Sequence, residues 1–224
     1  MRRQTGSGEV LLERAGPDSR AVAAVLLAVA ALAYNDWLLQ FFLPTGLDQR
    51  DSYVSELFAA DQPYRALFAT IEVACALLIA AAGLLAHRTF PSGAAGAGWA
   101  AVTAVGVCSV ADVMLPLRCA PSVEQGCRQG NAWHTLTSGS VHFALFTSMA
   151  LLIAASRRGA PCLGLVRRWG PWLLPISMAA AIATVGPFAG CPGGHGIAQR
   201  IHLATAGAWF ALLSGELSQG RRSG

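Results

Sequence analysis

The chain has 224 residues, of which 54% are hydrophobic and only 12% are charged, against about one quarter charged in soluble domains. This shortage of charge indicates a membrane protein and argues against a soluble fold. The formal net charge of +4 comes from arginine alone, and the arginines are grouped between apolar segments. Because they form no single basic face, we expect no nucleic-acid partner.

The sequence predicts an all-α integral membrane bundle of six transmembrane helices. Residues 1–18 mix Gly, Ser, Arg and Glu without periodicity, which predicts a disordered cytoplasmic tail. Residues 19–217 are expected to form the six-helix transmembrane domain, and residues 218–224 a second cytoplasmic tail. Each apolar segment has about 20 residues, enough to cross a hydrocarbon core of roughly 30 Å. In chain order, the predicted spans are Ser19–Phe42, Tyr64–Ala86, Ala94–Leu117, His134–Ser156, Pro171–Ala189 and Gly196–Leu217.

The positions of the arginines predict the orientation of the spans. With six spans, most arginines fall on one side of the membrane, and the opposite loops carry mainly acidic residues. The positive-inside rule then places both chain ends in the cytoplasm of a cell whose plasma membrane holds the protein. The arginines on that side are Arg2, Arg3, Arg14, Arg20, Arg88, Arg157, Arg158, Arg167, Arg168, Arg221 and Arg222.

Three cysteines fall in loops that this orientation places outside the cell. Cys119 and Cys127 share the third loop, and Cys191 lies in the fifth. An oxidising exterior favours disulfides, and a bridge between Cys119 and Cys127 is the first choice. Cys191 could instead pair with either of them, so the pairing stays open at this level.

Several ionisable residues fall inside the predicted spans, where a charge facing lipid costs several kcal/mol. From the rise of 1.5 Å per residue, most of them lie roughly 7 to 12 Å inside the outer boundary of the membrane core. Turning them toward one another predicts a polar pocket in the outer half of the bundle. These residues are Asp36, Glu72, Asp112, His134, His142, Arg200 and His202.

Two further features add to this predicted pocket. His134, Ser138 and His142 are spaced four apart, so they form one stripe on the fourth helix. The first outer loop, residues 44–63, is too long to be a minimal connector and could cover the pocket with Ser55 and Glu56.

The same residues allow several chemistries. Asp112, His142 and His202 are normal zinc ligands, although their spacing matches no compact metal motif. Ser52 or Ser55 with His134 or His142 and Asp112 could act as nucleophile, base and orienting acid, although no nucleophile elbow surrounds either serine. Glu72 and Arg200 could form an ion pair inside the membrane.

Four stretches of the chain resemble a known family. They read YVSELFAADQPYRALFA, ADVMLPLRC, HTLTSGSVHF and GIAQRIHLATAG. They are similar to a bacterial six-helix family catalogued as domain of unknown function number 998. More distantly, they are similar to the six-span membrane proteins that include GPI-anchor remodelling factors and autophagy modulators.

The resemblance matches Ser55 with Glu56, Asp112 with Pro116, and His134 with His142 to positions of that family's pattern. Leu117 follows Pro116 where the pattern has an acid. The resemblance implies a six-helix architecture with polar chemistry facing outward, and it implies no activity.

These observations favour a multi-pass protein of the cell membrane whose outer-leaflet pocket binds a membrane lipid or another small amphiphile. A metal-dependent intramembrane hydrolase or transferase, with zinc as cofactor, is the alternative from a different class. A structural or accessory membrane subunit without a small-molecule site is the third.

Overall fold

The computed structural model describes residues 17–127, 131–160, 163–190 and 193–219, and every regular element in these ranges is helical. Cys191 and most of the predicted N-terminal tail lie outside the described residues. The long elements are α1 (Pro17–Ala33), α2 (Arg65–Thr89), α3 (Gly93–Met114), α4 (Ala132–Arg157), α5 (Gly164–Ala183) and α6 (His195–Gln219). Three short 3-10 helices are η1 (Asp36–Phe41), η2 (Val54–Phe58) and η3 (Gly186–Ala189).

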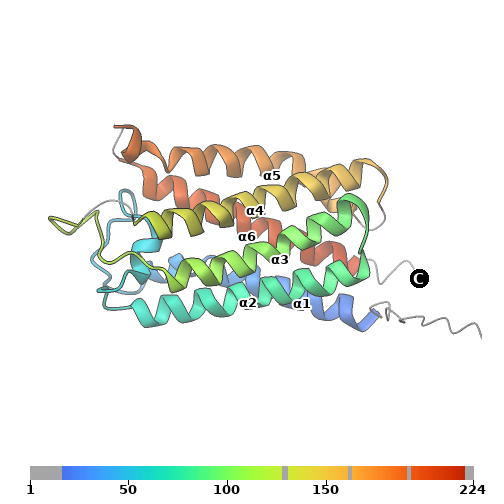
Figure 1. The fold of residues 1–224 in the computed structure, drawn as a ribbon, viewed down its shortest axis with the longest axis horizontal. Coiled ribbons are helices and arrows are strands. Elements are labelled where there is room, and N and C mark those ends of the chain that lie inside the picture. Colours follow the sequence, from blue (N-terminus) through green and yellow to red (C-terminus); the bar gives the residue numbers. More distant parts are fainter. Residues whose placement is uncertain (1–16, 128–130, 161–162, 191–192, 220–224) are drawn as a thin grey trace, which may run out of the picture.

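The six long helices run side by side along the long axis of the molecule (Figure 1). Each helix packs against the next one in the chain, and α6 packs against α1, which closes the ring. Large side chains such as Trp99, Trp209 and Phe210 fill its interior and are almost completely buried. Small residues let α2 and α3 approach closely, because a Cβ on Gly106 would overlap the backbone of Ala76 and Ala80. Close backbone contact at small residues is typical of helix packing in membranes.

Four helical segments are long and apolar enough to cross a membrane by length and composition: Ser19–Phe41, Arg65–Thr89, Gly93–Met114 and Ala132–Arg157. The all-helical class and the membrane character of the chain are therefore confirmed. Neither α5 nor α6 reaches the same level, so six spans and the orientation of the ends stay predictions.

The predicted first span, Ser19–Phe42, is not one continuous helix. It turns after Ala33 and continues as the 3-10 helix η1. Asn35 occupies this turn, where its side-chain amide donates to the carbonyl oxygen of Ala31 at 3.0 Å and its Oδ1 accepts from Trp37 Nε1 at 3.2 Å. A short polar side chain that bonds the nearby backbone favours such an interruption.

The fifth helix begins seven residues before the predicted start at Pro171 and ends at Ala183 instead of Ala189. Its first turn is stabilised by Glu216 of α6, whose Oε1 accepts from the backbone N–H of Val166 at 2.6 Å. Glu216 itself is buried, with only 2% of its surface exposed. An acceptor from another helix satisfies N–H groups that a helix start leaves unpaired.

The predicted first outer loop, residues 44–63, is attached to the start of α6 through its backbone. The N–H groups of Gly196 and Ile197 both point to the carbonyl oxygen of Arg50, at 2.9 and 3.3 Å. A Cβ on Gly196 would lie within 2.8 Å of the carbonyl oxygens of Gln49, Arg50 and Ser52. This close approach therefore requires glycine at position 196.

Arg200, one helical turn further along α6, completes this attachment. Its Nη1 donates to the carbonyl oxygens of Gln49, Ser52 and Gly196 at 2.8, 3.0 and 2.9 Å, and its Nη2 donates to Gln40. The predicted ion pair between Arg200 and Glu72 is therefore wrong, because loop carbonyl groups occupy the guanidinium. Such a planar donor fork suits several converging acceptors.

Cys119 and Cys127 form a disulfide, with their Cα atoms 6.0 Å apart. This confirms the pairing that was the first choice from the sequence. The bond closes the loop between α3 and α4, which lies at the same end of the bundle as η2 (Figure 1).

Replacing Glu216 with alanine should remove the acceptor at the start of α5. Loss of a helix cap costs about 0.5–2 kcal/mol, so the melting temperature in detergent should fall by a few degrees. Glu216→Gln keeps a neutral acceptor of the same length and should lose less. Equal melting temperatures for all three proteins would contradict this role.

Replacing Arg200 with alanine should release the first outer loop, because carbonyl groups left unpaired cost about 1–3 kcal/mol each. The measurement is the rate at which a protease cuts within residues 44–63 of the detergent-solubilised protein. Arg200→Lys should give an intermediate rate. Arg65→Ala, at an exposed arginine of the same end of the bundle, is the matched control and should leave the rate unchanged.

Candidate functional site

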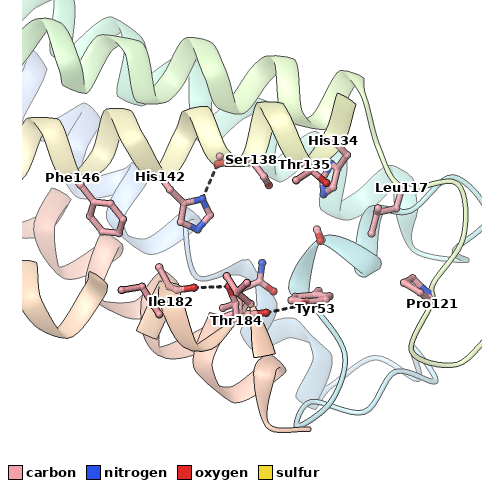
Figure 2. Close-up of a pocket in the computed structure, with 15 residues that line it drawn as sticks. Tyr53, Leu117, Pro121, His134, Thr135, Ser138, His142, Phe146, Ile182 and Thr184 are labelled. Carbon is pink, nitrogen blue, oxygen red and sulfur yellow. Dashed lines mark hydrogen bonds between the residues drawn. The ribbon is translucent and has the colours of Figure 1, made fainter. Parts of the chain in front are cut away.

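A cavity of about 360 Å³ separates α4 from the end of α5, at the end of the bundle that holds η2 and the loop after α3. Residues of η2, the loop after α3 and α6 close its other sides (Figure 2). Its walls are mainly apolar and carry a few polar groups, as small-molecule sites usually do. The lining residues used below are Tyr53, Ser55, His134, Ser138, Gly139, His142, Phe146, Ile182, Thr184, Val185 and Gln199.

The α4 wall of the cavity contains the predicted polar stripe. His134, Ser138 and His142 all line it, and Phe146 continues the row one turn further along. His142 Nδ1 lies 2.6 Å from the backbone oxygen of Ser138 (Figure 2). The spacing of four residues places these side chains on one face of the helix.

His202 lies next to this wall without lining the cavity. Its ring stacks on that of His142 with centroids 4.6 Å apart and an interplanar angle of 13°. Its Nδ1 lies 2.9 Å from Ser177 Oγ on α5. The pair of imidazoles therefore joins α4, α5 and α6 beside the cavity.

Asp112 of α3 does not line the cavity, but it bonds to residues of the α4 wall. Its carboxylate accepts from Thr137 Oγ1 at 2.6 Å and from Ser138 Oγ at 3.2 Å. It also lies 3.2 Å from His134 Nδ1, which is equally close to the backbone oxygen of Leu115. The hydroxyls of Thr137 and Ser138 on α4 thus hold the Asp112 carboxylate in place, and this carboxylate in turn orients the ring of His134.

The wall opposite α4 is built around Tyr53, which lies in the loop of residues 44–63. Its hydroxyl donates to the backbone oxygen of Thr184, at the end of α5, at 2.7 Å. Burial raises the pKa of Tyr53 to about 12, and the nearby Glu56 carboxylate contributes in the same direction. The phenol therefore stays protonated at physiological pH and remains a donor to α5.

Besides Asp112 and His202, four more of the predicted pocket residues do not line this cavity. Glu56 is fully buried and accepts from the backbone N–H of Tyr53 and from the N–H and hydroxyl of Ser122. Arg200 anchors the loop, as described above. Asp36 and Glu72 lie on η1 and α2, and Glu72 interacts electrostatically with Asp36 and Asp112.

The predicted zinc ligands do not converge. Asp112 is bonded to His134, Thr137 and Ser138, while His142 and His202 stack face to face. In the described part of the chain, no group of three or more His, Cys, Asp or Glu side chains could hold a metal ion. The residues present therefore do not fit the zinc site that the sequence allowed.

The two candidate serines differ in their surroundings. Ser52 is completely buried and its hydroxyl pairs with that of Ser122 at 2.7 Å. Ser55 lines the cavity and is partly exposed. Only Ser55 is therefore accessible to a molecule in the cavity.

Sequence reasoning missed Gln199 and His195. Gln199 Oε1 accepts from the backbone N–H of Val54 at 2.6 Å, which ties η2 to α6. His195 is 7% exposed and packs on Tyr53 with ring centroids 4.4 Å apart. The signal for either residue was its nearness to Arg200 and His202 in the HGIAQRIH stretch.

Comparison with known proteins gives one match. A search of curated proteins and a search of solved structures found none, so the similarity to GPI-anchor remodelling proteins is not supported. The profile of a family described as "protein of unknown function (DUF998)" matches residues 14–215. The match covers most of the chain, and it agrees with the resemblance seen in the sequence. This membrane protein therefore belongs to the DUF998 family.

Proposed function

We propose that this protein is a six-span protein of the cell membrane whose outer-leaflet cavity between α4 and α5 binds a lipid or another small amphiphile. The proposal rests on one observation, which is that the cavity wall has both polar and apolar side chains. Ser55, His134 and Gln199 provide hydrogen-bonding groups, whereas Phe146, Ile182 and Val185 provide an apolar surface. A molecule with one polar end and one apolar end matches this division.

The rim of the cavity supports access from the bilayer. Ile182 and Val185 line the cavity and are also 68% and 52% exposed, so the cavity is open at this rim. In a membrane these side chains would contact acyl chains. An amphiphile could therefore reach the cavity sideways without leaving the lipid.

The volume of the cavity limits the size of its ligand. About 360 Å³ is near the lower end of the range for small-molecule sites, which is about 300–1,000 Å³. We therefore expect one acyl chain, or a single-chain amphiphile, to occupy it, with the remaining parts of a larger lipid outside.

Two observations support membrane crossing by α5 and α6. On α6 the polar residues Arg200, His202 and Glu216 are buried, whereas Ile197 and Ile201 are exposed. On α5 the exposed residues include Arg167 and Arg168 near its start, and after them the large apolar side chains Trp169, Trp172, Ile176, Met178 and Ile182. Beyond the first turns of α5, both helices thus present large apolar residues outward. On α6 the buried Arg200, His202 and Glu216 lower the hydropathy of the helix without facing lipid.

Replacing Gly139 with leucine should block the cavity. Gly139 lines it, and a Cβ at this position would meet no atom within 4 Å, so the helix should tolerate the change. The probe is a diazirine-bearing lysophosphatidylethanolamine in proteoliposomes, with mass spectrometry of the labelled peptides. Labelling of Tyr53 to Gln62 and of α4 should fall about tenfold, which corresponds to about 1.4 kcal/mol of binding.

Gly164→Leu is the matched control, because Gly164 lies at the other end of the bundle and also has open space around it. It should leave labelling unchanged. Undiminished labelling of the Gly139→Leu protein, with an unchanged melting temperature, would contradict binding in this cavity.

The proposed orientation predicts that the disulfide faces outside. In a chain that keeps only Cys119 and Cys127, a membrane-impermeant maleimide should label intact cells after treatment with an impermeant reductant, and not before. The control is Ser218→Cys in a cysteine-free chain, at an exposed position near the end of α6. That cysteine should react only after permeabilisation, and the reverse pattern would invert the topology.

A further inference from the structure

We infer that the protein cleaves an acyl ester of the amphiphile in this cavity, or transfers its acyl group. Ser55 is the nucleophile, His134 the general base and Asp112 the residue that positions His134. The inference rests on the proposed function, since it concerns the same cavity. It names a chemical class of substrate: an amphiphile whose acyl chain is joined to its polar part through an ester.

The surroundings of His134 determine which ring nitrogen carries the proton. Nδ1 lies 3.2 Å from Asp112 Oδ1 and 3.2 Å from the backbone oxygen of Leu115. Both neighbours are acceptors, so Nδ1 must be protonated. Nε2 of the neutral ring then keeps its lone pair, and no described group forms a hydrogen bond with it. His134 thus offers a basic nitrogen while lining the cavity.

This arrangement is that of a histidine oriented by a carboxylate in nucleophilic catalysis. Thr137 and Ser138 hold Asp112 in place at 2.6 and 3.2 Å. Phe58 packs against the His134 ring at a centroid distance of 6.5 Å and an angle of 69°. The ring therefore has contacts on several sides and little freedom to rotate.

Ser55 differs from an ordinary loop serine, which caps a helix or bonds a turn. Among the described residues its hydroxyl has no hydrogen-bond partner. Its two neighbours in the chain are anchored, since Val54 N–H donates to Gln199 and Glu56 is bonded to Tyr53 and Ser122. The backbone is fixed on both sides of a hydroxyl that remains available to the cavity.

Gln199 supplies a donor for the carbonyl oxygen of the ester. Its Oε1 is identified by the bond from Val54 N–H, because a backbone N–H needs an acceptor. The side-chain NH₂ group is then left for the cavity that Gln199 lines. A donor of this kind stabilises the negative charge that develops on the oxygen during attack.

The other candidates in the cavity fit less well. His142 directs its Nδ1 to the backbone oxygen of its own helix, and its ring is stacked on His202. Among the described residues, no carboxylate forms a hydrogen bond or an ion pair with it. Ser52 is buried and paired with Ser122. The structure therefore selects Ser55 and His134 from the pairs that the sequence left open.

The reaction would proceed in two halves, which are transfer of the acyl group to Ser55 and its release from Ser55. Ser55 Oγ attacks the acyl carbon while His134 Nε2 takes the hydroxyl proton. The bond between that carbon and the alcohol oxygen then breaks, and His134 returns the proton to the departing alcohol. In the second half, water or another alcohol gives its proton to His134 Nε2 while its oxygen attacks the acyl carbon of the acyl-Ser55 ester. The bond between that carbon and Ser55 Oγ then breaks, and His134 returns the proton to Ser55 Oγ, which releases a carboxylic acid or a new ester and restores the Ser55 hydroxyl.

The test uses the full chain in proteoliposomes with an alkyl fluorophosphonate, which modifies activated serines covalently. Mass spectrometry should find the adduct on Ser55. Ser55→Ala should abolish modification, and Ser52→Ala should leave it unchanged. His134→Ala should slow modification by about 10²-fold or more.

The Asp112→Asn variant tests whether Asp112 positions the ring of His134. It should lower the limiting rate constant of modification without changing the concentration of fluorophosphonate that gives half of that rate. A purely structural role would instead change both constants together with the melting temperature, and this result would overturn the assignment of Asp112.

Diazirine-lysolipid labelling of the same proteins separates this inference from the proposed function. Labelling that is retained and sensitive to Gly139→Leu, with no adduct on Ser55, would overturn catalysis and leave binding in place. An adduct on Ser55 that forms as fast in His134→Ala would also overturn the inference. Loss of both lipid labelling and modification in the unaltered protein would overturn both proposals.

Discussion

The constraint on which this structure depends is that a polar group inside a bilayer must find its partners within the protein. The helices form a closed ring, and α6 shows how polar side chains can be turned into it. Arg200, His202 and Glu216 are nearly completely buried on α6 and bonded to a loop, to α5 and to the start of α5, respectively. Each of these three polar residues therefore also joins α6 to another element.

The same constraint gives the cavity a fixed shape at the loop end of the bundle. A loop is normally mobile, yet η2 is attached to α6 through Gln199 and Arg200, and to α5 through the Tyr53 hydroxyl. Backbone groups of the loop supply most of these bonds. Side chains of the loop, such as that of Ser55, thus remain free to face the cavity at a defined position.

The sequence alone was enough to predict the features that follow from helical periodicity and from the free-energy cost of burying a charge. The stripe of His134, Ser138 and His142 is an example, because spacing of four on one helix determines a common face. The disulfide was predictable because Cys119 and Cys127 share one loop. The partners of Glu216 and Arg200 were not, since both residues bond to backbone groups. A backbone N–H or carbonyl has no residue type, so the sequence carries no signal for its partner.

The predicted cluster of acids and imidazoles also divides in a way that residue types could not reveal. At the level of the sequence, Asp112 could serve a metal, a buried network or a base. Its bonds to Thr137, Ser138 and His134 direct it to the ring that lines the cavity, and the stacking of His142 on His202 removes them as metal ligands. In lipids the acyl ester lies between headgroup and chain, so the proposed substrate requires polar and apolar groups in one cavity. Ser55 and His134 line the same cavity as Phe146 and Ile182, which meets this requirement.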